Sequence, residues 1–194
     1  MRDDREGPAT LILFGHDGAG VWHSRASRAT LSDVNARRPP PPRSPMPPRS
    51  LTLLERQPCI DALLAVHVAA PEVCRRAVHE TRLFARRPTL SEIRGPASAI
   101  AHIALSSRAD GITLGRDVFI RRALFTETGG LPLSLVGHEV AHVAQVLERG
   151  PVSFYTRYVA QYLRGRARGL SDRDAYLQIP FEVEAREVGA LLRR

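Results

Sequence analysis

The clearest chemistry in this sequence lies in a pair of histidines with one glutamate between them. Residues 138–142 read H-E-x-x-H, with His138 and His142 four positions apart and Glu139 directly after the first histidine. On a helix, side chains four positions apart share a face, so both imidazoles can reach one ion, and Zn²⁺ suits such a pair. Glu139 points about 100° further round the helix. It can therefore act as a general base toward a water at the metal without being a ligand itself.

The neighbouring residues predict the helix that this chemistry needs. Residues 131–148 contain one proline, Pro132 near their start, and Gly150 follows them, which is typical of helix boundaries. Valines at 136, 140 and 143 and leucine at 147 form an apolar stripe, and His138, His142 and Gln145 lie roughly opposite. A helix with two purely structural histidines is the alternative interpretation of the same pattern.

A hydrolytic zinc site usually takes three protein ligands and keeps one position open for water. A last helix is predicted to begin at Pro180, and it carries three candidates for the missing ligand, Glu182, Glu184 and Glu187. Only one of them needs to face inward. The residues alone leave the choice among these carboxylates open.

Helices and one hairpin are expected to position these residues. Residues 51–66 have a helical pattern that Pro58 should interrupt, and Pro71 opens a second helix to about residue 86. Residues 100–120 have a β-type pattern, with a hairpin around a glycine-containing turn at 115–116. Further helices are predicted over residues 153–168, 171–177 and 180–194. We therefore expect an α+β domain over residues 51–194.

Residues 1–50 are predicted to be a disordered tail. Residues 37–50 are dense in arginine and proline, a composition that favours extended polyproline II over helix or sheet. Such a segment can be a spacer or a ligand for an aromatic groove, and the spacer is the simpler interpretation.

Composition restricts the partners. The formal charge is +8, and all the basic residues are arginine, spread along the whole chain without a nucleic-acid-binding motif. We therefore do not expect nucleic acid as a partner, although an arginine-rich nucleic-acid binder with an accidental H-E-x-x-H remains an alternative. No apolar run approaches the roughly 18 residues of a membrane span, and no secretory signal is recognisable. We expect a cytoplasmic protein, or one exported by a specialised apparatus without a cleaved signal peptide.

Three segments together resemble a known family. They are HEVAHVAQ at 138–145, GITLGRDVFI at 111–120 and PFEVEA at 180–185. They are similar to a bacterial family of zinc peptidases, a domain of unknown function described as the core domain associated with extracellular contractile injection systems. The similarity covers roughly residues 90–190. It implies a minimal zincin-like fold of gluzincin type, with a small β-hairpin or sheet, an active-site helix and C-terminal helices.

Carried over to this sequence, the resemblance implies Zn²⁺ as cofactor, His138 and His142 as ligands and Glu139 as the base. It implies Glu182 as the third ligand, with Glu184 in reserve. The sequence departs from the related pattern at Arg186, where an aspartate that supports a histidine ligand is common. Arg186 can instead pair with Glu182, which would weaken the assignment of Glu182.

The resemblance implies a zinc-dependent metalloendopeptidase that hydrolyses a peptide or protein substrate. The strand at 118–120 is expected to be the sheet edge along which the substrate pairs. Candidate donors to the oxyanion are Tyr158, Tyr162 and Tyr176. The alternative is a non-catalytic zinc-binding module associated with a contractile injection or toxin-effector system.

Overall fold

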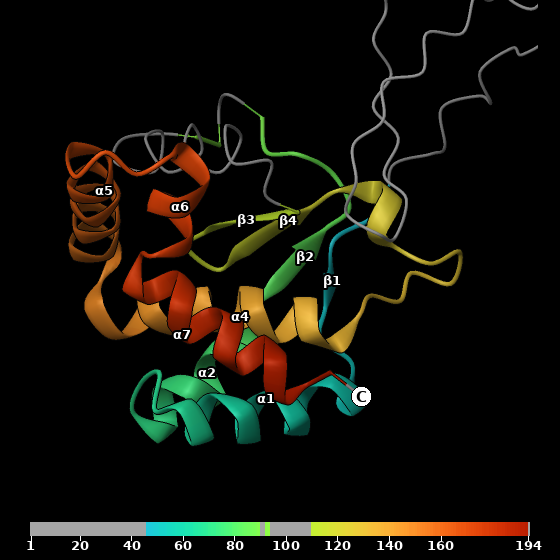
Figure 1. Cartoon of the computed structure of the whole chain (residues 1–194). Coiled ribbons are helices and arrows are strands. Elements are labelled where there is room, and N and C mark those ends of the chain that lie inside the picture. Colours follow the sequence, from blue (N-terminus) through green and yellow to red (C-terminus); the bar gives the residue numbers. More distant parts are fainter. Residues whose placement is uncertain (1–45, 90–91, 94–109, 194) are drawn as a thin grey trace, which may run out of the picture. The chain divides into compact units, whose positions relative to one another are not determined.

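The chain combines a small sheet with several helices (Figure 1). A computed structural model describes residues 46–89, 92–93 and 110–193 of the 194 residues. The expected α+β class is confirmed. Most of the predicted tail and the first predicted β run, at residues 100–107, lie outside the described residues. No helix in the described part is long and apolar enough to cross a membrane.

The sheet has four strands in the order β1-β2-β4-β3. These strands are β1 (Arg49–Ser50), β2 (Arg82–Phe84), β3 (Gly111–Leu114) and β4 (Asp117–Ile120). β3 and β4 form the predicted hairpin, with Ile112 opposite Phe119, and Gly115 takes the positive φ of 67° that the turn requires. β2 pairs with β4 in parallel. The expectation that residues 118–120 form the sheet edge is therefore wrong, because β4 has a neighbour on each side and β3 lies at the edge.

Six helices and one short 3-10 turn complete the described part. They are α1 (Leu53–Val66), α2 (Pro71–Glu80), η1 (Arg122–Leu124), α4 (Leu133–Arg149), α5 (Pro151–Ala167), α6 (Asp172–Leu177) and α7 (Pro180–Leu191). Pro58 does not interrupt α1. Pro58 lies in the second turn and removes only the backbone hydrogen bond to the Leu54 carbonyl. Leu54 is 88% exposed, so water can reach this part of the helix. The second predicted helix ends at Glu80, because the following residues pair with β4 as β2.

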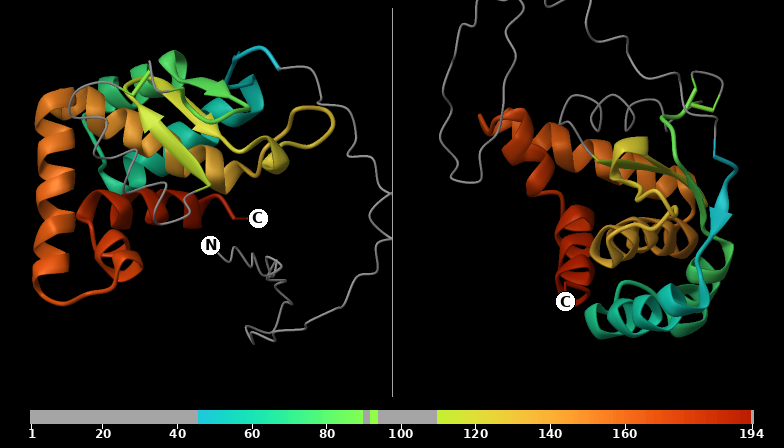
Figure 2. Two further views of the ribbon diagram at one scale, coloured as in Figure 1. Left: turned by 90° about the horizontal axis from the view of Figure 1, so that it is seen from above. Right: turned by 90° about the vertical axis from the view of Figure 1, so that its right-hand side faces the viewer.

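α4 runs through the middle of the molecule. The sheet lies on one side of it, α1 and α2 lie on the other, and α7 packs along it (Figures 1 and 2). Its valines at 136, 140 and 143 are completely buried in the main core, as the apolar stripe predicts. Two glycines bring α7 close: a Cβ at Gly189 would lie 2.8 Å from the Ser134 carbonyl oxygen, and one at Gly137 would lie 2.2 Å from Leu192. This close contact positions the start of α7 beside α4.

The N-terminal end of the described fold is fixed by one carboxylate. Glu55, in the first turn of α1, accepts two hydrogen bonds of 2.8 Å from the Arg49 guanidinium and one of 2.7 Å from the Thr52 backbone N–H. Arg49 belongs to β1, so the pair joins the sheet to the helix. Ordered structure therefore includes residues 49–50, which the sequence assigns to the tail.

Glu55→Gln is expected to lower the free energy of unfolding by about 1–2 kcal/mol at pH 7, since it weakens the cap and the Arg49 pair. Burial alone would raise the pKa of Glu55, but Arg49 and Thr52 hold the pKa below its ordinary 4.5. The stabilisation is thus present above the unfolded pKa and is lost as the pH falls through the folded one. Denaturant unfolding at pH 7 measures the loss of stability in the variant, and unfolding at about pH 3 measures how much of that loss disappears.

The matched control is Glu72→Gln, which alters an exposed glutamate in the first turn of α2. It should change stability by no more than about 0.5 kcal/mol at either pH. If the deficit of Glu55→Gln is as large at pH 3 as at pH 7, the ionised carboxylate is not its source.

Candidate metal centre

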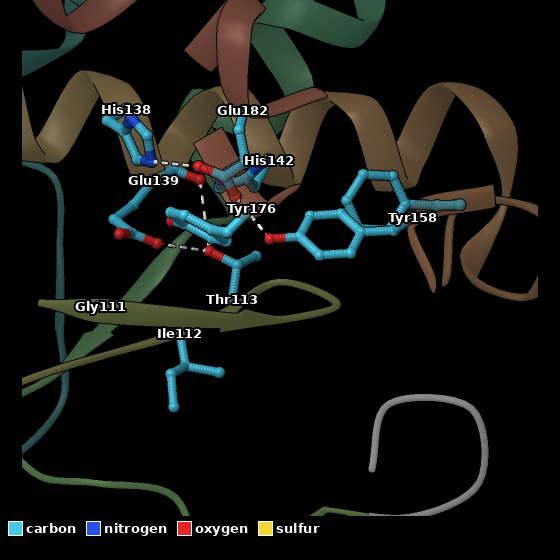
Figure 3. Close-up of a pocket in the computed structure, with 10 residues that line it drawn as sticks. Gly111, Ile112, Thr113, His138, Glu139, His142, Tyr158, Tyr176 and Glu182 are labelled. Atoms are coloured by element: carbon cyan, nitrogen blue, oxygen red, sulfur yellow. Dashed lines mark hydrogen bonds and ion pairs between the residues drawn. The ribbon is translucent and has the colours of Figure 1, made fainter. Parts of the chain in front are cut away.

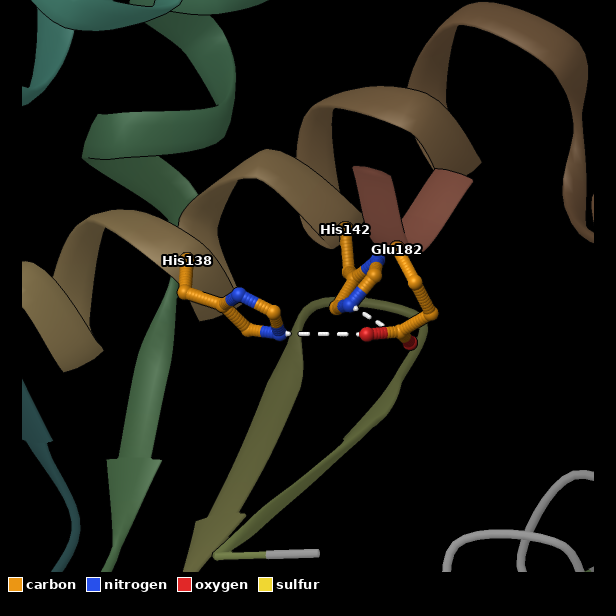
Figure 4. Close-up of side chains that lie close together, drawn as sticks. All are labelled: His138, His142 and Glu182. Atoms are coloured by element: carbon orange, nitrogen blue, oxygen red, sulfur yellow. Dashed lines mark ion pairs between the residues drawn. The ribbon is translucent and has the colours of Figure 1, made fainter. Parts of the chain in front are cut away.

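The two histidines of α4 meet a glutamate from α7 (Figure 4). His142 Nε2 lies 3.1 Å from Glu182 Oε1, and His138 Nε2 lies 3.4 Å from Glu182 Oε2. The two imidazole rings have centroids 4.9 Å apart and nearly perpendicular planes. One ligand atom from each of the three residues lies within 4.8 Å of the others. The fold therefore brings together the three residues that the sequence predicts as ligands.

The local surroundings of Glu182 fit a cation. Its side chain is buried, yet Oε2 forms no hydrogen bond and has only His138 Nε2 nearby, at 3.4 Å. A buried charged oxygen without a hydrogen bond is costly, and an ion between the three side chains would supply a closer contact. Two imidazoles and one carboxylate are also a donor set that zinc accepts. The residues present can thus hold a divalent metal ion.

The negative charge of this cluster lies on the Glu182 carboxylate. Burial alone would raise its pKa, but His142 and His138 hold the pKa of Glu182 well below its usual range. Burial alone would lower the pKa of His142, and the Glu182 carboxylate raises it to about 9. The carboxylate therefore stays ionised and attracts positive charge, which either a proton on His142 or a metal ion can supply.

Gln145 fixes the orientation of His142. Its Nε2 donates to the Phe181 carbonyl at 3.0 Å and to Glu184 at 2.9 Å, so its Oε1 faces His142 Nδ1 at 2.9 Å. His142 Nδ1 must then donate, so Nε2 is the nitrogen that faces Glu182. In a protonated ring Nε2 donates to that carboxylate, and in a neutral ring its lone pair is available to a metal ion. This contact supplies the support that the aspartate missing at position 186 would give.

The same contacts separate the two candidate glutamates. Glu184 accepts from Gln145 outside the cluster, whereas Glu182 lies between the histidines. Arg186 does not pair with Glu182; its guanidinium donates to the Leu177 carbonyl oxygen. Geometry thus favours Glu182 as the third ligand.

Two of the three candidate tyrosines lie at the site. Tyr158, from α5, donates to Glu182 Oε1 at 2.7 Å, and burial raises its pKa well above the ordinary value. Tyr176 lines the same pocket, and burial together with Glu182 raises its pKa. Tyr162 donates to Asp172 on an exposed surface instead. Tyr158 therefore orients the predicted ligand, while Tyr176 faces the space beside it.

Glu139 points toward the hairpin rather than toward Glu182 (Figure 3). Its carboxylate accepts a hydrogen bond of 2.8 Å from Thr113 on β3, and it fills the space in which Gly111 has no side chain, since a Cβ there would lie 2.3 Å from Oε1. Beside Glu139 and both histidines lies a cavity of about 30 Å³, enough for one or two water molecules. Sequence reasoning missed Gly111 and Thr113, although alternation along β3 puts both on one face.

Residues 87–150 match the family model described as the eCIS core domain. This match links the segment to extracellular contractile injection systems. The segment contains the hairpin and α4 with both histidines and Glu139, whereas Glu182 lies beyond it. None of the curated proteins and none of the solved structures matches the chain.

Glu182→Ala is expected to weaken zinc binding far more than Glu184→Ala, because only Glu182 lies among the ligand atoms. Competition with a chromogenic chelator gives both affinities, and elemental analysis of the purified proteins gives the zinc content. Equal zinc retention in the two variants would contradict the assignment of Glu182.

Gln145→Leu tests the support of His142 while keeping a side chain of similar size. It should reduce zinc affinity by about 10- to 100-fold, the usual effect of losing a hydrogen bond to a metal-binding histidine. The control, Gln178→Leu, alters an exposed glutamine. Unchanged affinity in a folded Gln145→Leu protein would show that Gln145 does not orient the ligand.

Proposed function

We propose that this protein is a zinc-dependent metalloendopeptidase of gluzincin type, with a zincin-like domain in which His138, His142 and Glu182 hold the metal. The observation that carries the proposal is the position of Glu139. Its carboxylate is buried next to the cluster but is held by Thr113, apart from the three ligand atoms. A purely structural metal site has no need of a second buried carboxylate, held in this way beside the ligand Glu182.

A bound zinc ion would supply Lewis acidity toward a carbonyl and toward water. Glu139 accepts the proton of the attacking water and passes it to the leaving amine. The hydrogen bond from Thr113 and the contact with Gly111 limit the rotation of this carboxylate. The Tyr176 phenol, kept protonated by burial and by Glu182, is the available donor toward the oxyanion.

β3 supports the binding of an extended peptide. Among the described strands it is one of the two edges of the sheet, and its residues Gly111–Thr113 line the site cavity. An extended substrate can add to this edge through backbone hydrogen bonds, with its scissile bond near Glu139. β3 therefore takes the role that the sequence assigned to residues 118–120.

A second candidate function is a non-catalytic zinc-binding module associated with a contractile injection or toxin-effector system. The observation that favours it is the family match over residues 87–150, which points to such a system and not to a reaction. Both candidates require the same metal ligands. Only hydrolysis separates them.

Glu139→Gln is therefore expected to keep zinc bound and to reduce peptide hydrolysis by about 10²- to 10⁴-fold, because the amide cannot accept the proton. Cleavage of an unstructured peptide library by the zinc-loaded full chain, followed by mass spectrometry, measures this loss. Glu127→Gln, which alters an exposed glutamate, is the matched control and should cleave like the wild type.

Two results would overturn the peptidase proposal. Undiminished cleavage by Glu139→Gln would remove Glu139 from the mechanism. A wild-type protein that binds zinc stoichiometrically and cleaves no peptide in the library would leave the binding module as the function.

A further inference from the structure

A second pocket opens from the candidate site along α7. It has a volume of about 280 Å³ and shares Gly111, His138, Glu139 and Tyr176 with the cavity at the metal ligands. This size is close to the lower end of pockets that bind small ligands. We call it the α7 groove; beyond the four shared residues it extends past Arg186 and Arg193.

The periodicity of α7 explains where these arginines lie. Glu182, Arg186 and Gly189 follow one another at intervals of four and three residues, which places them along one face of α7. Arg193 follows directly after the C-cap of this helix. Gly189 packs against the backbone of Ser134 in the first turn of α4. The groove thus lies between the N-terminal end of α4 and α7.

Two arginines, Arg186 and Arg193, bring positive charge to the groove. Arg186 donates through Nη2 to the Leu177 carbonyl, while its Nη1 is buried and has no hydrogen-bond partner. Within the described residues, neither Arg186 nor Arg193 forms an ion pair. Asp110 also lines the groove, but its carboxylate is already paired with Arg121.

The backbone of α4 adds to this charge. Ser134 lies in the first turn of α4, where unpaired backbone N–H groups carry a partial positive charge, and no side chain caps this end of the helix. A carboxylate in the groove would form charge-assisted hydrogen bonds with the guanidinium groups of Arg186 and Arg193, which line it. A neutral side chain would leave both positive charges without a counter-charge.

We propose that the α7 groove binds a carboxylate of a peptide, so that the site selects acidic peptides. The carboxylate can belong to an aspartate or glutamate side chain or to the free C-terminus of the peptide. As a statement about cleavage preference this rests on the proposed peptidase function. As a statement about binding it can be measured without hydrolysis.

The test uses the full chain with Glu139→Gln, loaded with zinc, and fluorescein-labelled unstructured peptides followed by anisotropy. One peptide carries two glutamates and its partner carries two glutamines, each made with a free and with an amidated C-terminus. We expect acidic peptides to bind about tenfold tighter than the neutral amidated peptide, as for a hydrogen bond to a charged group. A gain from the glutamates identifies the side chain as the ligand, and a gain from the free C-terminus identifies the terminal carboxylate.

Arg186→Gln should abolish the preference, and Arg157→Gln, which removes an exposed arginine outside the groove, should keep it. Arg193→Gln is the second variant, because its side chain is exposed and its loss should weaken acidic binding without affecting folding, which circular dichroism checks. Equal binding of all four peptides, or equal effects of Arg186→Gln and Arg157→Gln, would overturn the groove proposal.

The outcomes also separate this proposal from the peptidase. Acidic peptides that bind tightly while wild type cleaves nothing would support the groove and contradict hydrolysis. Wild type that cleaves neutral and acidic peptides at the same rate, with no preference in binding, would support hydrolysis and contradict the groove.

Discussion

The buried carboxylate of Glu182 between two imidazoles is the interaction on which the rest of the site depends. Removing a carboxylate from water costs several kcal/mol, which opposite charge and hydrogen bonds must offset. Tyr158 and His142 contact one oxygen, whereas the other forms no hydrogen bond and lies 3.4 Å from His138. The apolar packing of α7 against α4 holds the carboxylate there all the same. A charge kept in the core with one oxygen lacking a hydrogen bond is better explained by a function than by stability.

One face of α4 packs in the core and the other carries the site residues. Its valines pack into the core against α1, α2 and α7, and its histidines and Glu139 face α7 and the hairpin. The family match ends at residue 150, so it includes the histidines and Glu139 but not α7. The proposed third ligand, the tyrosines and the two groove arginines all come from the part of the chain that follows. Their contribution therefore rests on the structure alone.

The local sequence pattern predicts the helix of residues 131–148, the hairpin and the last helix, because hydrophobic periodicity and proline or glycine boundaries define these elements. It failed at β2, where Leu83 is buried only because a strand from much later in the chain pairs beside it. The same parallel pairing made β3 rather than β4 the edge. Tyr158 and Thr113 could not be assigned, since their partners lie on other elements. The contact between Gln145 and His142 is easier to predict, because Gln145 lies three residues after His142 on the same helix, where such a contact is common.

The most direct test of the central claim is X-ray absorption at the zinc edge on the zinc-loaded full chain. Coordination by His138, His142 and Glu182 predicts a first shell of nitrogen and oxygen at about 2.0–2.1 Å with outer-shell scattering from two imidazoles. Glu182→Ala should lose the metal or change that shell. A sulfur shell at about 2.3 Å would point to Cys59 or Cys74, the two cysteines of the sequence. A shell of oxygen alone would exclude the histidines. Either result would contradict the account.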